Sequence, residues 1–279
     1  MISDAAYGKS GIRLVKLARH GGRHHLTDLT VAIRFEGDYD ASYTAGDNRD
    51  LLPTDTMKNT VYALAADATL DDPEPFGLLL ARHFLDRNPR LQRVRVELVQ
   101  RPWERLSGGD GQAFVDSGPA RRTAIVSAAR GAVTVEAGVA DLYILKSARS
   151  GFSGFLRDEL TTLADTDDRI LATSLAAVWE YRQQRDVPFA TAWRAVRDTL
   201  LASFAEHRSA SVQHTLHAMG QAVLEARPDV LAIRLSMPNR HHLPVDLAPF
   251  GLENRNEIFV ATDAPFGLIE ATVRRTSRD

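Results

Sequence analysis

Residues 54–85, TDTMKNTVYALAADATLDDPEPFGLLLARHFL, contain two helical patterns in succession. In residues 54–67 and again in residues 73–85, apolar side chains recur at helical spacing, which predicts two amphipathic helices. Leu79 and Leu80 are both expected on the apolar face of the second helix, together with Phe76 and Phe84. Because each helix has only one apolar face, the pair needs a sheet to cover it.

Strand-like sequence flanks this helix pair on both sides. Residues 29–35 alternate between apolar and mostly polar side chains, which is typical of a strand with one buried face. Residues 94–98 alternate in the same way, and residues 121–126 and 133–145 are also strand-like. The first half of the chain therefore predicts strands before and after two helices.

The second half repeats this order. Its predicted strands and helices are residues 170–181 (strand), 188–204 and 211–224 (helices), and 230–237, 257–261 and 268–274 (strands). Pro188 is expected in the first turn of its helix, where the missing N–H is tolerated. We expect an α+β fold with two similar units, residues 1–146 and 147–279. Each unit would be an antiparallel sheet with a helix pair on one face.

Composition excludes several classes of protein. The net charge of 279 residues is −2, and no basic run suggests a nucleic-acid partner. No apolar stretch is long enough to cross a membrane, and the first residues do not resemble a secretory signal, so we expect a cytoplasmic protein. Cysteine is absent, which excludes disulfides and thiolate metal sites.

Lysine is rare, and arginine supplies most of the positive charge. The only lysines are Lys9, Lys16, Lys58 and Lys146. Lys9 lies in the string YGKSG, which we expect to be a short N-terminal loop. A solvated surface charge is the ordinary role of such a lysine, and a general base is the alternative if its pKa is lowered.

Other polar positions leave the same choice between a structural and a chemical role. Thr54 precedes a helical pattern, so it is expected to cap that helix unless its hydroxyl has another task. Arg169 could pair with Asp167 or Asp168 on the surface. Gln213 could be an exposed residue of a first helical turn.

Two further segments are equally open. Phe152, in SGFSGF, could be an ordinary core residue. His241 and His242 follow Asn239 in PNRHH, where a turn or a metal site is possible. No third spaced ligand accompanies the two histidines, so we expect no metal.

Strings in these segments, in the same order along residues 7–273, resemble the urate oxidase family. They are YGK, SYT-x-x-DN, TDT-x-KNT-x-Y, SGF-x-GF-x-RDE-x-TTL, DRI-x-AT, SASVQ and S-x-PN-x-H. The resemblance implies a tunnelling fold (T-fold) with two tandem units per subunit and a homotetramer. It also implies oxidation of urate by O₂ to 5-hydroxyisourate and H₂O₂, without metal or organic cofactor.

The resemblance assigns each candidate a role at a site shared between subunits. Lys9, Thr54 and His241 would form a catalytic proton relay, in which the threonine hydroxyl both donates and accepts. Asp55 would orient or cap. The implied substrate-binding residues, besides Asp55, are Phe152, Leu163, Arg169, Val212 (through its backbone), Gln213 and Asn239.

Each binding role has a chemical reason. The guanidinium of Arg169 and the amide of Gln213 would hold opposite edges of urate, because a fork of donors and a donor–acceptor pair match its carbonyl and N–H groups. The resemblance stacks Phe152 on the purine face, pads the ring edge with Leu163, and lets Asn239 hold O₂ or water above the ring.

The chain departs from the family at Leu160, often tyrosine, and at Asp167, often tryptophan. Neither is implied to touch urate. Two other functions remain open: a purine- or pterin-binding enzyme of the same fold with a different reaction, and a non-catalytic binding tunnel.

Overall fold

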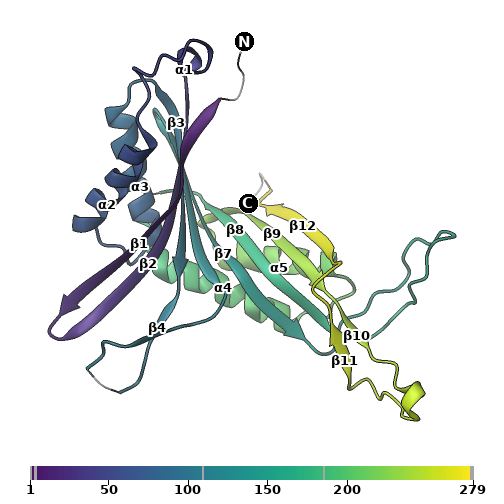
Figure 1. The fold of residues 1–279 in the computed structure, drawn as a ribbon. Helices are drawn as coiled ribbons and strands as arrows, with labels where there is room; N and C mark the ends of the chain where they lie inside the picture. Colours follow the sequence, from purple (N-terminus) through teal and green to yellow (C-terminus); the bar gives the residue numbers. More distant parts are fainter. Residues whose placement is uncertain (1, 3–4, 109, 185, 277–279) are drawn as a thin grey trace. The chain divides into compact units, whose positions relative to one another are not determined.

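The computed structural model describes residues 2, 5–108, 110–184 and 186–276. The chain forms two compact units, which are treated separately below (Figure 1). Unit 1 is Met1–Gly138 with Trp179–Trp193, and unit 2 is Val139–Val178 with Arg194–Asp279. The division at residue 146 expected from the sequence stays a prediction. No helix among the described residues is long and apolar enough to cross a membrane.

Unit 1 is an antiparallel sheet with two helices on one face (Figure 1). Its strands lie in the order β1-β2-β3-β6. The elements are β1 (Ala6–His20), β2 (Arg23–Gly37), α1 (Asp40–Thr44), α2 (Thr54–Asp67), α3 (Pro73–Arg87), β3 (Leu91–Arg101), β4 (Trp103–Arg105), β5 (Phe114–Asp116), β6 (Arg121–Ala129) and the first part of β7 (Ala132–Lys146). The predicted alternation of residues 29–35 is confirmed, since Leu29, Val31, Ile33 and Phe35 are all buried.

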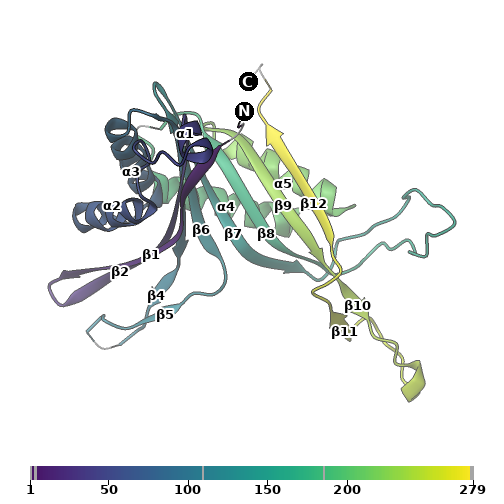
Figure 2. The same cartoon turned by 45° about the horizontal axis from the view of Figure 1, so that its top comes forward.

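Unit 2 has the same design, with α4 and α5 along one face of its strands (Figure 2). The order is the second part of β7, then β8, β9 and β12, and β9 pairs with β12 antiparallel. The elements are β8 (Leu171–Tyr181), α4 (Phe189–Glu206), α5 (Val212–Ala226), β9 (Val230–Arg240), β10 (His242–Pro244), the 3₁₀ helix η1 (Ala248–Phe250), β11 (Phe259–Ala261) and β12 (Gly267–Arg274). β10 and β11 pair as a separate hairpin.

Two helix positions differ from the sequence prediction. Pro188 lies just before α4 rather than in its first turn, and its carbonyl accepts a hydrogen bond from the Ala192 N–H at 2.8 Å. Leu79 is 40% exposed, whereas Leu80 is fully buried. Adjacent helical residues point about 100° apart, so the apolar stripe could not bury both leucines equally.

Each unit uses a glycine to bring a helix onto its sheet. A Cβ atom on Gly77 of α3 would lie 2.7 Å from the Val126 side chain, and one on Gly220 of α5 would lie 2.5 Å from the Val273 side chain. Such distances are closer than packed carbon atoms tolerate. The two units therefore share a packing device that neither hydrophobic pattern reveals.

Two lysines bind carbonyl groups at the ends of helices. The Lys16 ammonium donates to the carbonyls of Ala65, Ala66 and Ala68 at 2.7–2.9 Å, at the end of α2. The Lys146 ammonium donates in the same way to Phe204 and His207 at the end of α4. These carbonyls have no acceptor role within their helices, so the two lysines satisfy them.

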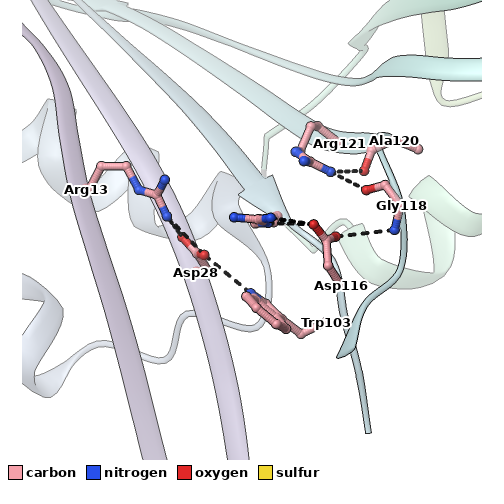
Figure 3. Close-up of polar contacts among 8 residues, drawn as sticks. Arg13, Asp28, Trp103, Asp116, Gly118, Ala120 and Arg121 are labelled. Atoms are coloured by element: carbon pink, nitrogen blue, oxygen red, sulfur yellow. Dashed lines mark hydrogen bonds and ion pairs between the residues drawn. The ribbon is translucent and has the colours of Figure 1, made fainter. Parts of the chain in front are cut away.

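A polar network anchors the β4–β5 hairpin to the sheet of unit 1 (Figure 3). The carboxylate of Asp28 is almost fully buried and accepts hydrogen bonds from Arg13 at 2.8 Å and from the Trp103 indole N–H at 3.3 Å. Arg101 lies over the Trp103 ring and donates to Asp116 at 2.5 Å. The buried carboxylate is thus paired, as a buried charge requires.

Candidate active site

A cavity of about 420 Å³ lies within unit 2. Its walls come from the loop after β7, the start of α5, the end of β9 and the β10–β11 hairpin. This loop and hairpin extend from one end of the unit's strands (Figure 2). The residues of the sequence-predicted site that line it are Phe152, Leu163, Arg169, Val212, Gln213, Asn239 and His241. Widely separated motifs of the sequence therefore meet at one pocket.

Backbone hydrogen bonds tie three of these motifs together. Phe152 and Thr166 exchange backbone hydrogen bonds at 2.8 and 3.0 Å. The Arg169 N–H donates to the carbonyl of Ser150 at 2.7 Å. Ser150 also forms a parallel bridge with Ser209, which precedes α5. The fixed backbone sets the positions of Phe152, Arg169 and the start of α5 relative to one another.

Arg169 is a half-buried cation without a counter-charge in the described part of the chain. Its guanidinium carbon lies 5.3 Å from the centroid of Phe152, and its Nε is buried with no hydrogen-bond partner among the described residues. Burial lowers its pKa. The surface ion pair considered from the sequence is not formed, since Asp168 instead accepts a hydrogen bond from the Arg149 N–H at 2.9 Å. A bound anion would compensate this charge.

The start of α5 presents unused N–H donors to the same cavity. Ser211 is the N-cap, and its hydroxyl accepts a hydrogen bond from the His214 N–H at 3.1 Å. Val212 and Gln213 are the first residues of the helix, so their N–H groups have no partner within it. Val212 is 3% exposed and Gln213 is exposed at the surface. A helix N-terminus of this kind favours a bound anion or carbonyl oxygen.

Phe152 and Leu163 supply the apolar part of the cavity. The ring of Phe152 is half-buried and stacks on that of Phe155, with centroids 4.9 Å apart and planes 9° from parallel. Leu163 is 54% exposed and lies at the edge of the pocket. The departures Leu160 and Asp167 are both exposed and do not line the cavity.

Asn239 and His241 close the cavity at the end of β9. Asn239 pairs in register with Gly267 of β12, and the carbonyl of His241 accepts a hydrogen bond from the Thr262 N–H at 2.9 Å. Both side chains are half-buried. His242 makes a contact of 3.2 Å with the carbonyl of Arg240. Within the described ranges, no group of three or more histidine, cysteine, aspartate or glutamate residues is arranged to hold a metal ion.

Lys9, Thr54 and Asp55 belong to unit 1 and are not among the residues that line this pocket. The prediction that Lys9 lies in a loop is wrong, because it lies in β1 opposite Ile33 of β2. The register shifts directly after it, where Gly11 takes a positive φ of 69°. The extended segment had no strict apolar alternation because β1 has mostly half-exposed side chains.

Lys9 differs from the other lysines. Lys58 pairs with Asp55 at 2.5 Å, and Lys16 and Lys146 cap helices. Lys9 is half-buried as a residue, and its ammonium makes no hydrogen bond with any residue that the structure describes. Its positive charge helps to lower the pKa of Asp55, although the hydrogen bond from Lys58 is the larger cause.

Thr54 does not cap α2 as its position in the sequence suggested. Pro53 is the N-cap, and its carbonyl accepts a hydrogen bond from the Met57 N–H at 3.1 Å. Thr54 is instead the first helical residue. It is half-buried, and its hydroxyl has no hydrogen bond within the described ranges. Asp55 accepts hydrogen bonds from Lys58 and from the Asn59 amide at 2.9 Å. Thr54 therefore keeps its hydroxyl available.

Sequence reasoning missed part of the cavity wall. Asn256, Phe259 and Ile269 also line the pocket. They lie in or beside the predicted strands 257–261 and 268–274, where periodicity indicates a strand but not which distant segments its side chains meet. Phe155 stacks on Phe152 without lining the cavity, and its only signal in the sequence is the repeated Gly-Phe of SGFSGF.

Comparisons with known proteins show the family of the chain. A family model described as uricase matches residues 5–127 and 135–270. The chain is 44% identical over 275 residues to uricase from Arthrobacter globiformis, covering 99% of this chain and 90% of that protein. It is 36% identical to uricase from Danio rerio, covering 98% of this chain and 94% of that protein.

Solved structures give the same result. The crystal structure of Arthrobacter globiformis uricase matches with a TM-score of 0.95 and 42% identity, covering 99% of this chain and 96% of that one. The α+β tunnelling fold and the resemblance to urate oxidases that the sequence indicated are thereby confirmed. The chain belongs to the uricase family, and it is an enzyme of the oxidoreductase class.

Proposed function

We propose that this enzyme oxidises urate at a site of which the cavity in unit 2 is the substrate-holding part. Arg169 carries the proposal: it is a half-buried cation with an unpartnered Nε, it lines the cavity, and no described residue neutralises it. Urate is an anion at neutral pH, and its planar carbonyl and N–H edges suit a guanidinium fork.

The cavity residues hold urate by its edges and one face. Arg169 donates to one carbonyl edge, while the side chain of Gln213 and the N–H of Val212 bind the opposite edge. Phe152 stacks on the ring, an interaction that contributes about 1–3 kcal/mol per base in nucleic-acid complexes. Leu163 covers the ring edge. Held in this way, the anion meets its reaction partners in a fixed orientation.

A proton relay completes the site. Lys9 acts as the base, the hydroxyl of Thr54 passes the proton, and His241 extends the relay. The negative charge of Asp55 orients the residues of the relay. Asn239 holds O₂ or water over the urate ring. In the overall reaction, counted from neutral urate, two electrons and two protons pass to O₂, which becomes H₂O₂; one of these protons leaves when the urate anion forms. The hydroxyl of water adds to a ring carbon and the remaining proton of that water goes to a ring nitrogen, which gives 5-hydroxyisourate.

The proposal uses no metal and no organic cofactor, because the electron-rich urate anion is itself the reductant. The protein supplies orientation and proton transfer. The expected partners are urate and O₂, with neither nucleic acid nor membrane. The cytoplasmic location expected from the sequence is also part of the proposal.

A direct assay tests the proposed function. Purified enzyme in air should remove the ultraviolet absorbance of urate and release one equivalent of H₂O₂ for each urate consumed, as the balanced reaction requires. Folded protein that leaves urate unchanged at several pH values would contradict the proposal.

We also propose a homotetramer in which each site is shared between subunits. In this arrangement Lys9 and Thr54 come from one subunit, and Phe152, Arg169 and Gln213 from its neighbour. His241 belongs with the second set rather than with Lys9 and Thr54, because it lines the same cavity as Arg169 and Gln213. Specific activity should therefore fall on dilution as the protein dissociates, because a monomer lacks a complete site. Light scattering gives the oligomeric state at each concentration. Monomers with full activity would disprove a shared site.

A further inference from the structure

Two stacked groups follow Phe152 in the loop after β7, in addition to Arg169, whose guanidinium carbon lies 5.3 Å from the Phe152 centroid. The parallel ring of Phe155 follows, 4.9 Å away between centroids. The guanidinium carbon of Arg157 lies 4.7 Å from the centroid of Phe155. Phe152 lines the cavity whereas Phe155 does not, so Phe155 supports the side of Phe152 that is turned away from the pocket.

The backbone of the loop is built to bring the two rings together. Gly154 lies between them with a positive φ of 70°, a conformation that glycine adopts without strain. Its N–H donates to the Asp165 carboxylate at 3.1 Å. Phe152 is held by its backbone bridge to Thr166, so the reversal at Gly154 folds Phe155 back onto a fixed ring.

The outer end of the stack is fixed as well. Arg157 forms an ion pair of 3.3 Å with Asp165 and donates to the carbonyl of Leu163 at 3.1 Å. The loop tip is closed separately by Thr161, which donates to the Asp158 carboxylate at 2.8 Å. Phe155 is half-buried and contacts both the Phe152 ring and the Arg157 guanidinium, whereas its neighbour Leu156 is 95% exposed. These contacts fix the position of Phe155 against the Phe152 ring.

We propose that Phe155 is a positioning residue that holds the Phe152 ring in the plane on which urate stacks. The proposal rests on the proposed function. If only a flexible segment of chain lay behind the Phe152 ring, the ring could tilt. A tilted ring loses contact with a planar ligand. Support by a second parallel ring removes that freedom before urate binds, so less conformational entropy is lost on binding.

Replacing Phe155 with leucine tests this proposal. KM for urate should rise about threefold to tenfold, the range expected for loss of one aromatic pair, while kcat stays within about twofold. The dissociation constant of xanthine, a planar purine of similar shape, should rise by the same factor. Phe155→Tyr keeps the ring and should retain the wild-type KM and xanthine affinity.

Controls separate positioning from folding. Leu156→Ala removes an exposed apolar side chain from the same loop and should change neither constant. If Phe155→Leu does not fold, Phe155→Met replaces it, since methionine fills the space without a ring. An unchanged KM and xanthine affinity in the ringless variant, or equal losses in the leucine and tyrosine variants, would overturn the proposal. Wild-type enzyme that fails to oxidise urate would instead overturn the proposed function.

Discussion

Lys9→Met should lower kcat for urate by about 10²- to 10⁴-fold, the usual contribution of a positioned general base. The chain should fold normally, because the Lys9 ammonium makes no hydrogen bond with the described residues. Steady-state kinetics and thermal melting of the purified variant check both statements. A variant that keeps half of the wild-type kcat would exclude Lys9 as the base.

Two companion variants show whether proton transfer is what has been lost. Lys9→Arg keeps the positive charge but cannot give up its proton near neutral pH, so it should be as inactive as Lys9→Met.

Thr54→Ala should also slow turnover steeply while urate still binds, because it breaks the proton relay and leaves the urate-binding residues unchanged. Thr56→Ala is the matched control, since Thr56 lies in the same helical turn and is exposed. Equal effects at Thr54 and Thr56 would argue for helix stability instead.

Arg169→Met should lower kcat/KM for urate by about a hundredfold or more. Each hydrogen bond from a charged donor contributes about 1.5–3 kcal/mol, and the guanidinium fork can donate two to the purine edge. The melting temperature should not fall, because the change removes a half-buried charge that no described residue neutralises. Lost activity with retained stability would distinguish a binding group from a structural one.

Arg194→Met is the control for charge and side-chain size. Arg194 lies exposed on α4, outside the set of residues that line the cavity. Its replacement should leave kcat/KM and melting temperature near the wild-type values. If Arg169→Met melts well below both proteins, Arg169 supports the fold, and its proposed role as the anion-binding group would need to be abandoned.

Hydrophobic periodicity predicted the helices and most strands, because burial of one face imposes a period on local sequence. Helix α2 begins and ends at the predicted residues, Thr54 and Asp67. The same method failed at Lys9, where β1 has few buried side chains and therefore little alternation. The prediction that Thr54 caps α2 was also wrong, because Pro53 is the N-cap residue and Thr54 is the first residue of the helix.

By itself, the sequence determined the order of elements, the motifs and the types of side chain available for chemistry. Only the tertiary structure decided which polar groups have partners. Lys16 binds a carbonyl 49 residues away and Lys146 one 58 residues away, whereas Arg169 keeps an unpartnered Nε. Hydrogen bonds and neutralising charges come from segments distant along the chain, so no local pattern can show which groups they leave unsatisfied. At this pocket, that unsatisfied charge is the observation on which the proposed anion site rests.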